Sequence, residues 1–520
     1  MPAVWAALVC LGMSLGCKVG PHYAPPATCV PETWNQELPE GVSLVPQHEL
    51  LDTSWWTVFR DPALDQLVFE AANSNLELRS TGIRIVETRA QRAIVAGGLF
   101  PWVDAKASYT RNQISTNGNP FGLSGGGIPG FGGFQPFDIF STGFDASWEL
   151  DLFGQVRRAV EAADADIGVA IEDHRGIAVS LFAEVATAYV EMRTLQEQIQ
   201  VAEKNAEIQN DTVRLTKERF DAGKESRLPL AQATSTLRNT QAAIPSLRSQ
   251  LRSVMHRLCV LRAQVPRDLE PELGTGKIPK APSEILLGLP ISLIRQRPDV
   301  RRAEREMAAQ TARVGVAVAD LYPDVSLTGT FTLDSVDFGS LFDGKSIAYR
   351  LTGPALRWKI LYFGRIRNNI RVQDAKLQQA MLRYENTVLR SLEEVENALN
   401  AYVELQQRLQ YLEQAVTFAE EATKLSLTRY DAGSENFQPV LDAQKFQLVV
   451  EEQRASTRGN VALRLIALYK ALGGGWQYRP FTTMSLEPDT VDQPADMGGE
   501  EDVPAPPEAA DPPVNVDRVP

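Results

Sequence analysis

The sequence feature that most constrains the fold is a duplication at a fixed offset. The segment Arg219–Gly223, which reads RFDAG, returns 210 residues later as RYDAG at Arg429–Gly433. The same offset relates Phe153-Gly154 to Phe363-Gly364. A period this long excludes a solenoid, whose repeats span about 20 to 50 residues. It predicts one half-molecule made twice, each half with a strand pair, a very long helix, a sharp turn and a second long helix. That plan is typical of a duct rather than of an enzyme cleft.

The negative charge of the chain is concentrated at its C-terminal end. Of the net charge of -13, -9 falls between Leu486 and Pro520, where ten acidic residues accompany a single basic one, Arg518. This stretch has eight prolines and no aromatic residue, so it cannot bury enough apolar surface to offset the entropy of ordering. We predict a disordered acidic tail over 477–520. The rest of the chain is nearly neutral and lacks the basic surface that nucleic acid requires.

The N-terminus has the features of a targeting segment. Ala3–Leu15 is an apolar run, too short to span a bilayer and placed like the hydrophobic region of a signal peptide. It ends in Ser-Leu-Gly-Cys, which resembles a bacterial lipoprotein cleavage site, so we predict a signal peptide at 1–16 and lipid on the thiol of Cys17. An ordinary signal peptide with an incidental cysteine is the alternative. Cys29 and Cys259 are too few for a disulfide scaffold and lack metal-ligand spacing, and the apolar neighbours of Cys259 predict a buried side chain.

Four segments of about ten residues alternate apolar and polar residues, which predicts strands with two different faces. They are 102–110, 140–151, 324–334 and 347–358. Pro354 weakens the last one, and the carboxylates of Asp145, Glu149 and Asp151 share the polar face of the second. The length suits a tilted membrane strand, although a soluble sandwich gives the same alternation. Open edges do not occur in lipid and four strands cannot close a barrel, so membrane strands would require several chains to share one barrel.

Most of the remaining chain is predicted to form long helices. No proline interrupts Ile366–Thr428, and its apolar residues recur with a mean step close to 3.5, the spacing of coiled coils. About 60 residues would form a rod of roughly 90 Å. Gly223 and Gly433 are predicted to end these rods in left-handed turns, and Pro229 and Pro439 fall near the start of each returning helix.

The sequence contains no catalytic or metal-binding constellation. The four histidines are scattered, and the zinc-protease, Cys-x-x-Cys and nucleophile-elbow motifs are absent. Gly339–Ser346 fits the pattern of a phosphate-binding P-loop, but such a loop must join a buried strand to a helix. Here it joins two alternating strands, so we predict a hairpin loop, with nucleotide binding through Lys345 as the disfavoured alternative. We therefore predict no enzyme activity and no cofactor.

Several motifs together resemble those of one family. The sequence KVGPHYAPP after Cys17 resembles the mature start of outer-membrane efflux lipoproteins. Trp55–Asp65 resembles the W-W-x-x-F-x-D-P-x-L signature of that family, and Arg297–Glu304, followed by Tyr322-Pro323, resembles its R-P-D-[IV]-x-x-A-E and [FY]-P elements. With the duplicated halves, the resemblance covers about 17–476. On these motifs the chain is identified as a member of the TolC-type outer-membrane factors, in the branch that serves resistance–nodulation–division pumps.

The resemblance implies a mainly helical fold with a membrane β-barrel portion. Three identical chains would each contribute four strands to one shared barrel and pairs of long coiled-coil helices to a periplasmic tunnel. The protein would lie in the outer membrane, in contact with lipid, and extend into the periplasm. Its partners would be a periplasmic adaptor and an inner-membrane pump, and its cargo would be small molecules such as drugs, toxic compounds or metals.

The resemblance also carries functional residues onto this sequence. Arg429, Tyr430 and Asp442 match residues that close the periplasmic end of the tunnel in the family. The turns at Gly223 and Gly433 would contact the adaptor. Without the resemblance, Arg429 and Asp442 would be interpreted as solvated charges on a helix surface, where an ion pair contributes little.

The sequence thus predicts six segments in order. They are a signal peptide (1–16), an irregular segment (17–60), a first repeat (61–270), a connector (271–298), a second repeat (299–476) and an acidic tail (477–520). Three other functions stay open: a duct for type I protein secretion, a P-loop ATPase, and a periplasmic coiled-coil scaffold or adaptor. The last should lack the amphipathic strand pairs.

Overall fold

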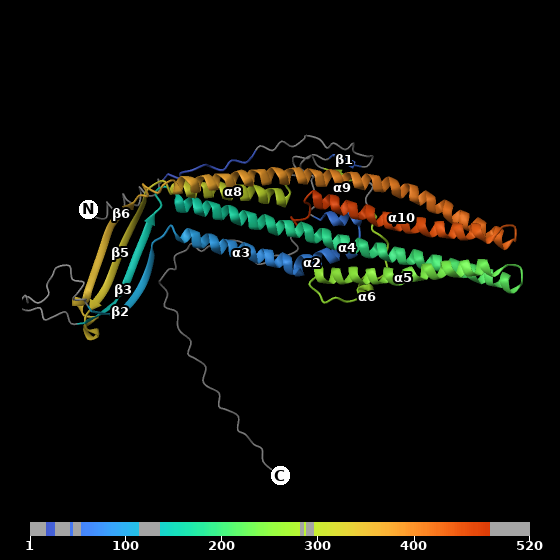
Figure 1. The fold of residues 1–520 in the computed structure, drawn as a ribbon, viewed down its shortest axis with the longest axis horizontal. Helices are drawn as coiled ribbons and strands as arrows, with labels where there is room; N and C mark the ends of the chain where they lie inside the picture. The colour runs from blue at the N-terminus through green and yellow to red at the C-terminus, as the bar shows by residue number, and fades with distance from the viewer. Residues whose placement is uncertain are drawn as a thin grey trace, which may run out of the picture. The chain divides into compact units, whose positions relative to one another are not determined.

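The computed structural model describes residues 17–26, 42–44, 54–113, 136–280, 285–287 and 296–478. The predicted signal peptide, Cys29, most of the glycine-rich loop between the first two strands and residues 479–520 of the predicted tail lie outside the described residues. The described residues belong to one structural unit, which ends at Tyr478. A four-stranded sheet lies at one end of this unit, and the helices run from it to two hairpin tips at the other end (Figure 1).

The helices confirm the duplication. Two helices of 67 residues, α4 and α9, each end in a tight turn from which a helix of 35 residues, α5 or α10, returns. The bounds are α4 Gln155–Asp221, α5 Arg227–Leu261, α9 Arg365–Asp431 and α10 Phe437–Ala471. Each bound in the second repeat therefore lies 210 residues after its counterpart in the first. The helices before the strands, α3 Leu76–Gly97 and α8 Pro298–Ala319, also have equal lengths of 22 residues. At 1.5 Å per residue, α4 and α9 are roughly 100 Å long.

The helical region with which the predicted first repeat (61–270) begins is divided in two at Asn75. The elements of this region are the 3-10 helix η1 Trp55–Phe59, α2 Pro62–Ser74 and α3. The side-chain oxygen of Asn75 accepts the N–H of Leu78 at 2.9 Å and so caps α3. Its side-chain nitrogen donates to the carbonyl of Leu261 at 3.0 Å, at the end of α5. One amide group thereby joins the beginning of α3 to the end of α5.

Arg297 makes the equivalent contact in the second repeat, immediately before α8. Its Nη1 donates to the carbonyl of Ala471 at 2.5 Å, at the end of α10. Its Nη2 pairs with the carboxylates of Asp299 and Glu394, each at 2.7 Å. A cation beside the last carbonyls of a helix is favourable, because the helix dipole concentrates negative charge there. The Arg-Pro-Asp motif therefore fastens the returning helix α10 to α8 and α9.

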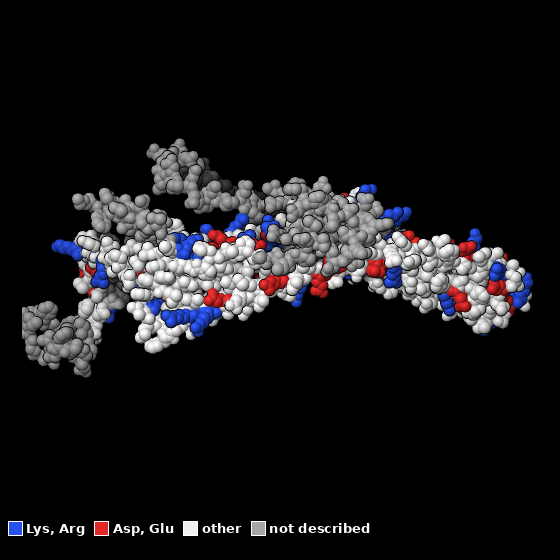
Figure 2. Space-filling model, turned by 90° about the horizontal axis from the view of Figure 1, so that it is seen from above, with Lys and Arg blue, Asp and Glu red and all other residues white. Residues whose placement is uncertain are grey.

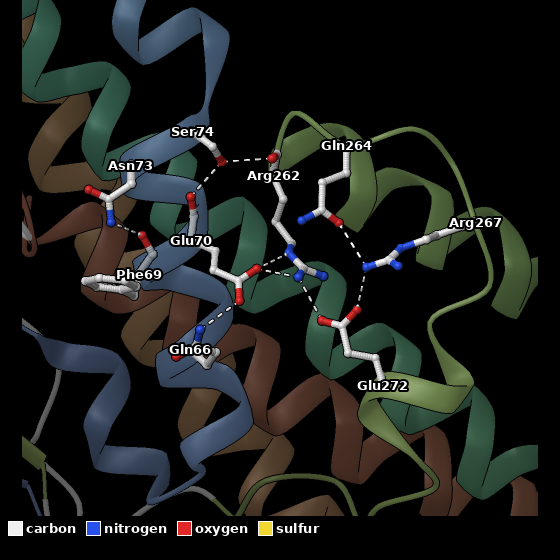
Figure 3. A network of polar contacts seen from close by, with 9 residues as sticks. All are labelled: Gln66, Phe69, Glu70, Asn73, Ser74, Arg262, Gln264, Arg267 and Glu272. Atoms are coloured by element: carbon white, nitrogen blue, oxygen red, sulfur yellow. Dashed lines mark hydrogen bonds and ion pairs between the residues drawn. The ribbon is translucent and has the colours of Figure 1, made fainter.

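A second arginine, Arg262, fastens the end of α5 (Figure 3). It is 3% exposed, and its guanidinium pairs with Glu70 of α2 and with Glu272 of the short helix α6, Glu270–Leu273. Its backbone carbonyl accepts the hydroxyl of Ser74 at 2.8 Å. A buried guanidinium needs such carboxylates, because an unpaired buried charge is strongly unfavourable. The network fixes α2, α5 and α6 relative to one another.

The four long strands form one antiparallel sheet in the order β2-β3-β5-β6. Their bounds are β2 Trp102–Asn112, β3 Phe137–Leu150, β5 Asp324–Ser335 and β6 Ile347–Arg357. β2 and β6 are the outer strands, so each has one edge unpaired within the described chain. Pro354 is tolerated in β6 because Gly353 and Pro354 together face Leu327 in a β-bulge on this outer strand. A short parallel pair, β1 Val42–Leu44 with β4 Ile285–Leu287, forms separately.

Asp151 does not lie on the polar face of a strand, so that prediction is wrong. β3 ends at Leu150, and the carboxylate of Asp151 accepts the N–H groups of Val156 at 3.2 Å and Arg157 at 2.9 Å. These bonds satisfy backbone N–H groups at the start of α4 that have no partner within the helix. Capping of these groups therefore outweighs the alternating pattern that predicted a strand position for Asp151. Asp145 does lie in β3, where it pairs with Lys106 of β2 at 2.7 Å.

The segment after Cys17 is fixed to the junction between sheet and helices. The buried Arg158 of α4 donates to the carbonyls of Val19 at 3.0 Å and Gly20 at 3.3 Å. Gly20 has a φ of 89°, and a Cβ at this position would lie 2.6 Å from the Cα of Gly315 in α8. Only glycine fits so close to another backbone. The exposed Cys17 therefore lies beside the start of α4, at the sheet end of the helices.

The main hydrophobic core lies midway along the helices. Trp55 stacks on Tyr469 of α10 with ring centroids 5.4 Å apart, and Trp56 meets Phe182 of α4 edge-on at 5.2 Å. The Trp-Trp motif is therefore a packing element of this core. Cys259 is fully buried in the same core, as predicted. Within the described segments, no helix has both the length and the apolar character needed to cross a membrane.

Gly459 allows α10 to approach α4 closely, which generates a first prediction. A Cβ at this position would lie 2.2 Å from Oγ1 and 3.0 Å from Cβ of Thr194. Alanine is favoured over glycine in a helix interior by about 1 kcal/mol, but overpacking costs about 1–3 kcal/mol. We expect Gly459→Ala to lower the Tm of the protein in detergent, measured by scanning calorimetry. Gly82→Ala in α3, where the nearest atom would lie 3.9 Å away, should leave the Tm unchanged or raise it. Equal effects of the two substitutions would contradict the close approach of α4 and α10.

Candidate functional site

The two hairpin tips are built on the same backbone motif. Gly223 and Gly433 adopt φ angles of 67° and 71°, which L side chains rarely adopt. In the first tip the N–H of Lys224 donates to the carbonyl of Arg219 at 2.9 Å, and the second tip repeats this bond 210 residues later at 3.0 Å. These are the bonds of a Schellman motif, which ends a helix at a left-handed glycine. The predicted turns at Gly223 and Gly433 thus lie at the same end of the helices (Figure 1).

Tyr430 is the centre of the contact between the two tips. Its side chain is fully buried, and its hydroxyl donates to the carboxylate of Glu225 at 2.5 Å. The guanidinium of Arg219 lies 4.6 Å from the centre of the Tyr430 ring and donates to the Tyr430 carbonyl at 2.6 Å. Burial, and then the hydrogen bond to Glu225, raise the pKa of Tyr430 above its ordinary value, so the phenol remains a proton donor. One side chain of the second hairpin is thus held between two charged groups of the first.

The other two predicted gate residues lie apart from this contact. Arg429 has a side chain that is 69% exposed and pairs with Glu435 at 3.9 Å. Asp442 is exposed and accepts a hydrogen bond from Gln438 at 2.9 Å, one turn away on α10. Among the described residues, no ion pair or hydrogen bond joins Arg429 to Asp442. Their exposure leaves both side chains available to another chain.

Arg219 and Glu225 form a contact that the sequence reasoning did not assign. The resemblance placed gate residues only in the second repeat. The offset of 210 relates the ion pair Arg219–Glu225, at 3.6 Å, to the pair Arg429–Glu435. The first pair is largely buried, with side chains 18% and 19% exposed, because Tyr430 lies against it. The signal that could have found the first pair is the duplication itself, since it repeats an arginine and a glutamate at equal spacing.

The family of this chain follows from a match over most of its length. Residues 67–261 and 289–474 match the model of the family described as outer membrane efflux protein. The chain belongs to the outer membrane efflux protein family. This membership confirms the family, the outer-membrane location and the role in efflux that the motifs predicted. It also agrees with the sheet, which a periplasmic scaffold would lack.

Relatives and solved structures match this efflux protein over nearly all of their length. Nodulation protein T of Rhizobium leguminosarum bv. viciae is 30% identical over 467 residues, which is 88% of this chain and 91% of that protein. The toluene efflux pump outer membrane protein TtgF of Pseudomonas putida is 28% identical, with coverage of 89% and 94%. The solved outer-membrane channel OprN superposes with a TM-score of 0.80 at 33% identity, covering 89% of this chain and 100% of that one.

The described part of this efflux protein contains the P-loop match, which lies in a hairpin between two strands. No group of His, Cys, Asp and Glu in the described part is arranged to hold a metal ion. Gly339–Ser346 connects β5 to β6 through two 3-10 turns, η2 Phe338–Ser340 and η3 Gly344–Ser346. A strand follows rather than a helix, so no helix N-terminus is available to bind phosphate. The predicted hairpin loop is confirmed.

A buried polar layer joins α4 to α10 of the efflux protein, farther from the tips. Asn205 donates to Glu451 at 2.5 Å, and Gln444 donates to Thr212 at 2.8 Å. Gln209 lies between them on α4 and is 2% exposed, and its side-chain amide has no partner among the described residues. Polar residues at buried positions of a helix pair specify the register but reduce stability. The layer therefore aligns the two hairpins while holding them less firmly than an apolar contact would.

The two equivalent glutamates provide a matched test of the contact between the tips. Glu225→Gln keeps the size of the side chain but removes its charge, and a hydrogen bond to a charged group contributes about 1 kcal/mol more than a neutral one. We expect Glu225→Gln to increase amide hydrogen exchange severalfold in the last turns of α9. Glu435→Gln, the equivalent change in the second tip, should leave this exchange unchanged. If both variants exchange like the parent, the contact with Tyr430 does not hold the tips together.

Proposed function

We propose that three copies of this chain form one duct across the outer membrane and the periplasm. An inner-membrane pump, joined through a periplasmic adaptor, delivers small molecules to it. The observation that carries the proposal is the sheet, which has four strands and two edges unpaired within the described chain. A strand edge cannot remain open in lipid, so β6 of one chain pairs with β2 of the next until the barrel closes. The name of the toluene efflux relative supports a small-molecule cargo.

The duplicated tips support a ring of chains. In such a ring the contact between an arginine and an aromatic ring forms once within each chain and once more between neighbouring chains. Within one chain, Arg219 of the first tip covers Tyr430 of the second. The equivalent pair, shifted by the repeat offset, is Arg429 of one chain and Phe220 of its neighbour. Both are uncovered in the single chain, with Arg429 69% and Phe220 38% exposed. In the ring, Arg429 therefore lies over Phe220 of the next subunit. Because Phe220 lacks the hydroxyl group of Tyr430, it makes no hydrogen bond to Glu435.

An apolar stripe on α9 supports the same ring. Tyr411, Phe418 and Leu425 recur every seven residues and are 63%, 68% and 53% exposed. Their counterparts on α4 are buried or half-buried: Val201, Ile208 and Leu215. Apolar residues at heptad spacing indicate contact with another helix, and a stripe of this kind does not stay exposed in a stable protein. The neighbouring subunit therefore covers the apolar stripe of α9, just as the chain itself covers the equivalent positions of α4.

The tips close the periplasmic end of this duct. Tyr430 acts within each chain, and Arg429 acts between chains together with Asp442. A narrow, partly dry constriction lowers the effective dielectric constant, so an ion pair there is stronger than on an open surface. The turns at Gly223 and Gly433 are the parts of the chain that meet the adaptor. Lipid on Cys17 anchors the sheet end, where Cys17 is exposed.

Removal of the gate charges provides a functional test. Asp442→Ala and Arg429→Ala should each raise single-channel conductance in planar bilayers and sensitise cells to large antibiotics. A lost interaction of about 1–2 kcal/mol shifts the ratio of closed to open states by a factor of roughly 5–30. Gln232→Ala is the matched control, because Gln232 occupies the position equivalent to Asp442 in the first repeat. Conductance equal to that of the parent in both variants would show that Arg429 and Asp442 are only surface charges.

Cross-linking tests the ring and its composition. In a background with Cys29→Ser and Cys259→Ser, the double variant Phe220→Cys/Arg429→Cys should give covalent trimers with a short thiol–thiol cross-linker. The control Phe220→Cys/Arg408→Cys should not, because Arg408 lies 21 residues before Arg429 on α9, roughly 30 Å away.

Native mass spectrometry in detergent should show three copies, each with diacylglyceryl mass on Cys17. A soluble monomer with ordered strands contradicts the shared barrel, and an unmodified peptide that runs through Cys17 contradicts acylation.

A further inference from the structure

The contact between the two hairpins of one chain changes character along its length. Near the middle of the molecule α10 packs on α4 in the main hydrophobic core, which extends along α10 from Val461. At the tips a second apolar cluster forms around Tyr430 and reaches Leu441 of α10. Between the two clusters, α10 contacts α4 through the polar side chains of Gln444, Glu451 and Arg458. This stretch, residues 194–212 of α4 and 444–459 of α10, is called the internal seam because it lies within one chain.

An ionic layer crosses the internal seam at its end farther from the tips. Arg458 of α10 pairs with Glu197 of α4 at 2.9 Å and with Glu413 of α9 at 3.3 Å. The second of these pairs recurs in the first hairpin at the offset of 210, where Arg248 pairs with Glu203 at 2.7 Å. It therefore belongs to the common design of the two hairpins. The pair with Glu197 is the part of the layer that joins one hairpin to the other.

A second ionic layer lies one heptad nearer the tips and has the opposite polarity. Its cation is Lys204 of α4, which pairs with Glu420 of α9 at 3.4 Å and with Glu451 of α10 at 3.9 Å. Because α4 and α10 are antiparallel, a slide of α10 by one heptad would place Arg458 beside Lys204. A slide in the other direction would place Glu451 beside Glu197. Like charges repel, so the two layers together specify the register of the seam. Basic and acidic side chains do lie next to one another on the helices that lead to the tips (Figure 2).

Part of the internal seam is unsatisfied in the closed structure. Gln209 is 2% exposed, and neither polar atom of its side-chain amide has a partner among the described residues. The side chain of Glu451 is 2% exposed, whereas that of its cation Lys204 is 59% exposed and reaches water. Water compensates a buried polar group that lacks or loses its partner. Separation of the hairpins along this seam therefore costs less free energy than separation of an apolar contact.

The equivalent contact between subunits lacks this chemistry. In the proposed ring, α9 of one chain meets α5 of the next as α4 meets α10 within a chain, and this contact is called the subunit seam. At the offset of 210, the equivalents of Glu197, Lys204, Gln209 and Glu451 are Gln407, Gln414, Ala419 and Gln241. Arg458 keeps an arginine counterpart, Arg248, but this residue meets Gln407 in place of a carboxylate. Neither cross-hairpin ion pair is thus repeated in the subunit seam, which the apolar stripe of α9 also supports.

We propose that the duct opens along the internal seam of each chain. After the tip contacts are released, the α9–α10 hairpin swings away from α4 on its apolar contact with the next subunit, and water enters the internal seam. The swing ends at Gly459, where α10 lies so close to α4 that a Cβ would be 2.2 Å from Oγ1 of Thr194. The two ionic layers return the hairpin to its closed register. This opening rests on the proposed ring and gate, and it identifies which of the two contacts of the hairpin separates.

Matched disulfides distinguish the two seams. They are introduced into the Asp442→Ala variant, in the serine-substituted background used for cross-linking. Asn205→Cys/Glu451→Cys spans the internal seam, where the two native side chains are hydrogen-bonded at 2.5 Å. Ala415→Cys/Gln241→Cys is the equivalent pair across the subunit seam. Oxidation of the first pair should abolish the increase in single-channel conductance that Asp442→Ala causes, and oxidation of the second should leave that increase intact. Reduction should restore it in the first case.

The outcomes separate the seam from the ring and the gate. Loss of the increase with both disulfides, loss with the subunit disulfide alone, or retention with both would overturn the opening along the internal seam. Covalent trimers formed by the subunit pair support the ring on which the opening rests, and their absence contradicts it. If Asp442→Ala conducts like the parent, the gate assignment has failed, and thiol labelling decides on the seam.

Thiol labelling tests the internal seam without the gate. Gln209→Cys places a thiol in the internal seam and Ala419→Cys places one at the equivalent position of α9, and both native side chains are buried. The first thiol should react faster with a maleimide, each rate being taken relative to that of the denatured protein. Lys204→Gln leaves the buried charge of Glu451 uncompensated, so it should accelerate labelling of the first thiol at least about tenfold. Lys217→Gln, at an exposed lysine of α4, is the control and should not change the rate. Equal labelling of the two thiols, or an unchanged rate in Lys204→Gln, would overturn the proposal.

Discussion

The fold depends on the burial of α4. This helix packs extensively against α2, α3, α5, α8 and α10, whereas its counterpart α9 packs extensively only against α8 and α10. Helices gain most of their stability from the packing of an apolar face, so a helix of roughly 100 Å needs cover along its length. The chain supplies that cover for α4 and only part of it for α9. This imbalance, rather than any single residue, is the physical argument for the proposed ring of several chains.

Much of the fold could be predicted from the sequence because its signals are local and repeated. Alternation identified the four strands to within three residues at their ends, and heptad spacing with the tip glycines identified the long helices. The break at Asn75 was missed because it depends on a hydrogen bond to Leu261, which is distant in the sequence. Pro245 lies inside α5 without ending it, on an exposed face of the helix. A proline normally interrupts a helix, so tertiary packing here outweighs the local preference.

The candidate site was less predictable than the fold. Gly223, Gly433 and Tyr430 could be found, but the partners of Tyr430 are supplied by the other hairpin, and no pattern within one hairpin reveals them. The duplication is the better guide to function, because equivalent positions have the same backbone and different side chains. Asn75 and Arg297 fasten the two returning helices with different chemistry, and Tyr430 and Phe220 differ by one hydroxyl group. Side chains that differ on a shared backbone show where the two halves have acquired different roles.

The contact of Gly20 with Gly315 also constrains the order in which the chain can fold. These residues are almost 300 positions apart, and contacts of such long range form slowly because a large loop must close first. Val19 and Gly20 contact both α4 and α8, so their binding surface is complete only when these two helices are already packed together. The N-terminal segment therefore lacks part of its contacts while the second repeat is still unfolded. It becomes a rigid part of the molecule only after α8 is in place, so the end of the chain that is made first is among the last to be fixed.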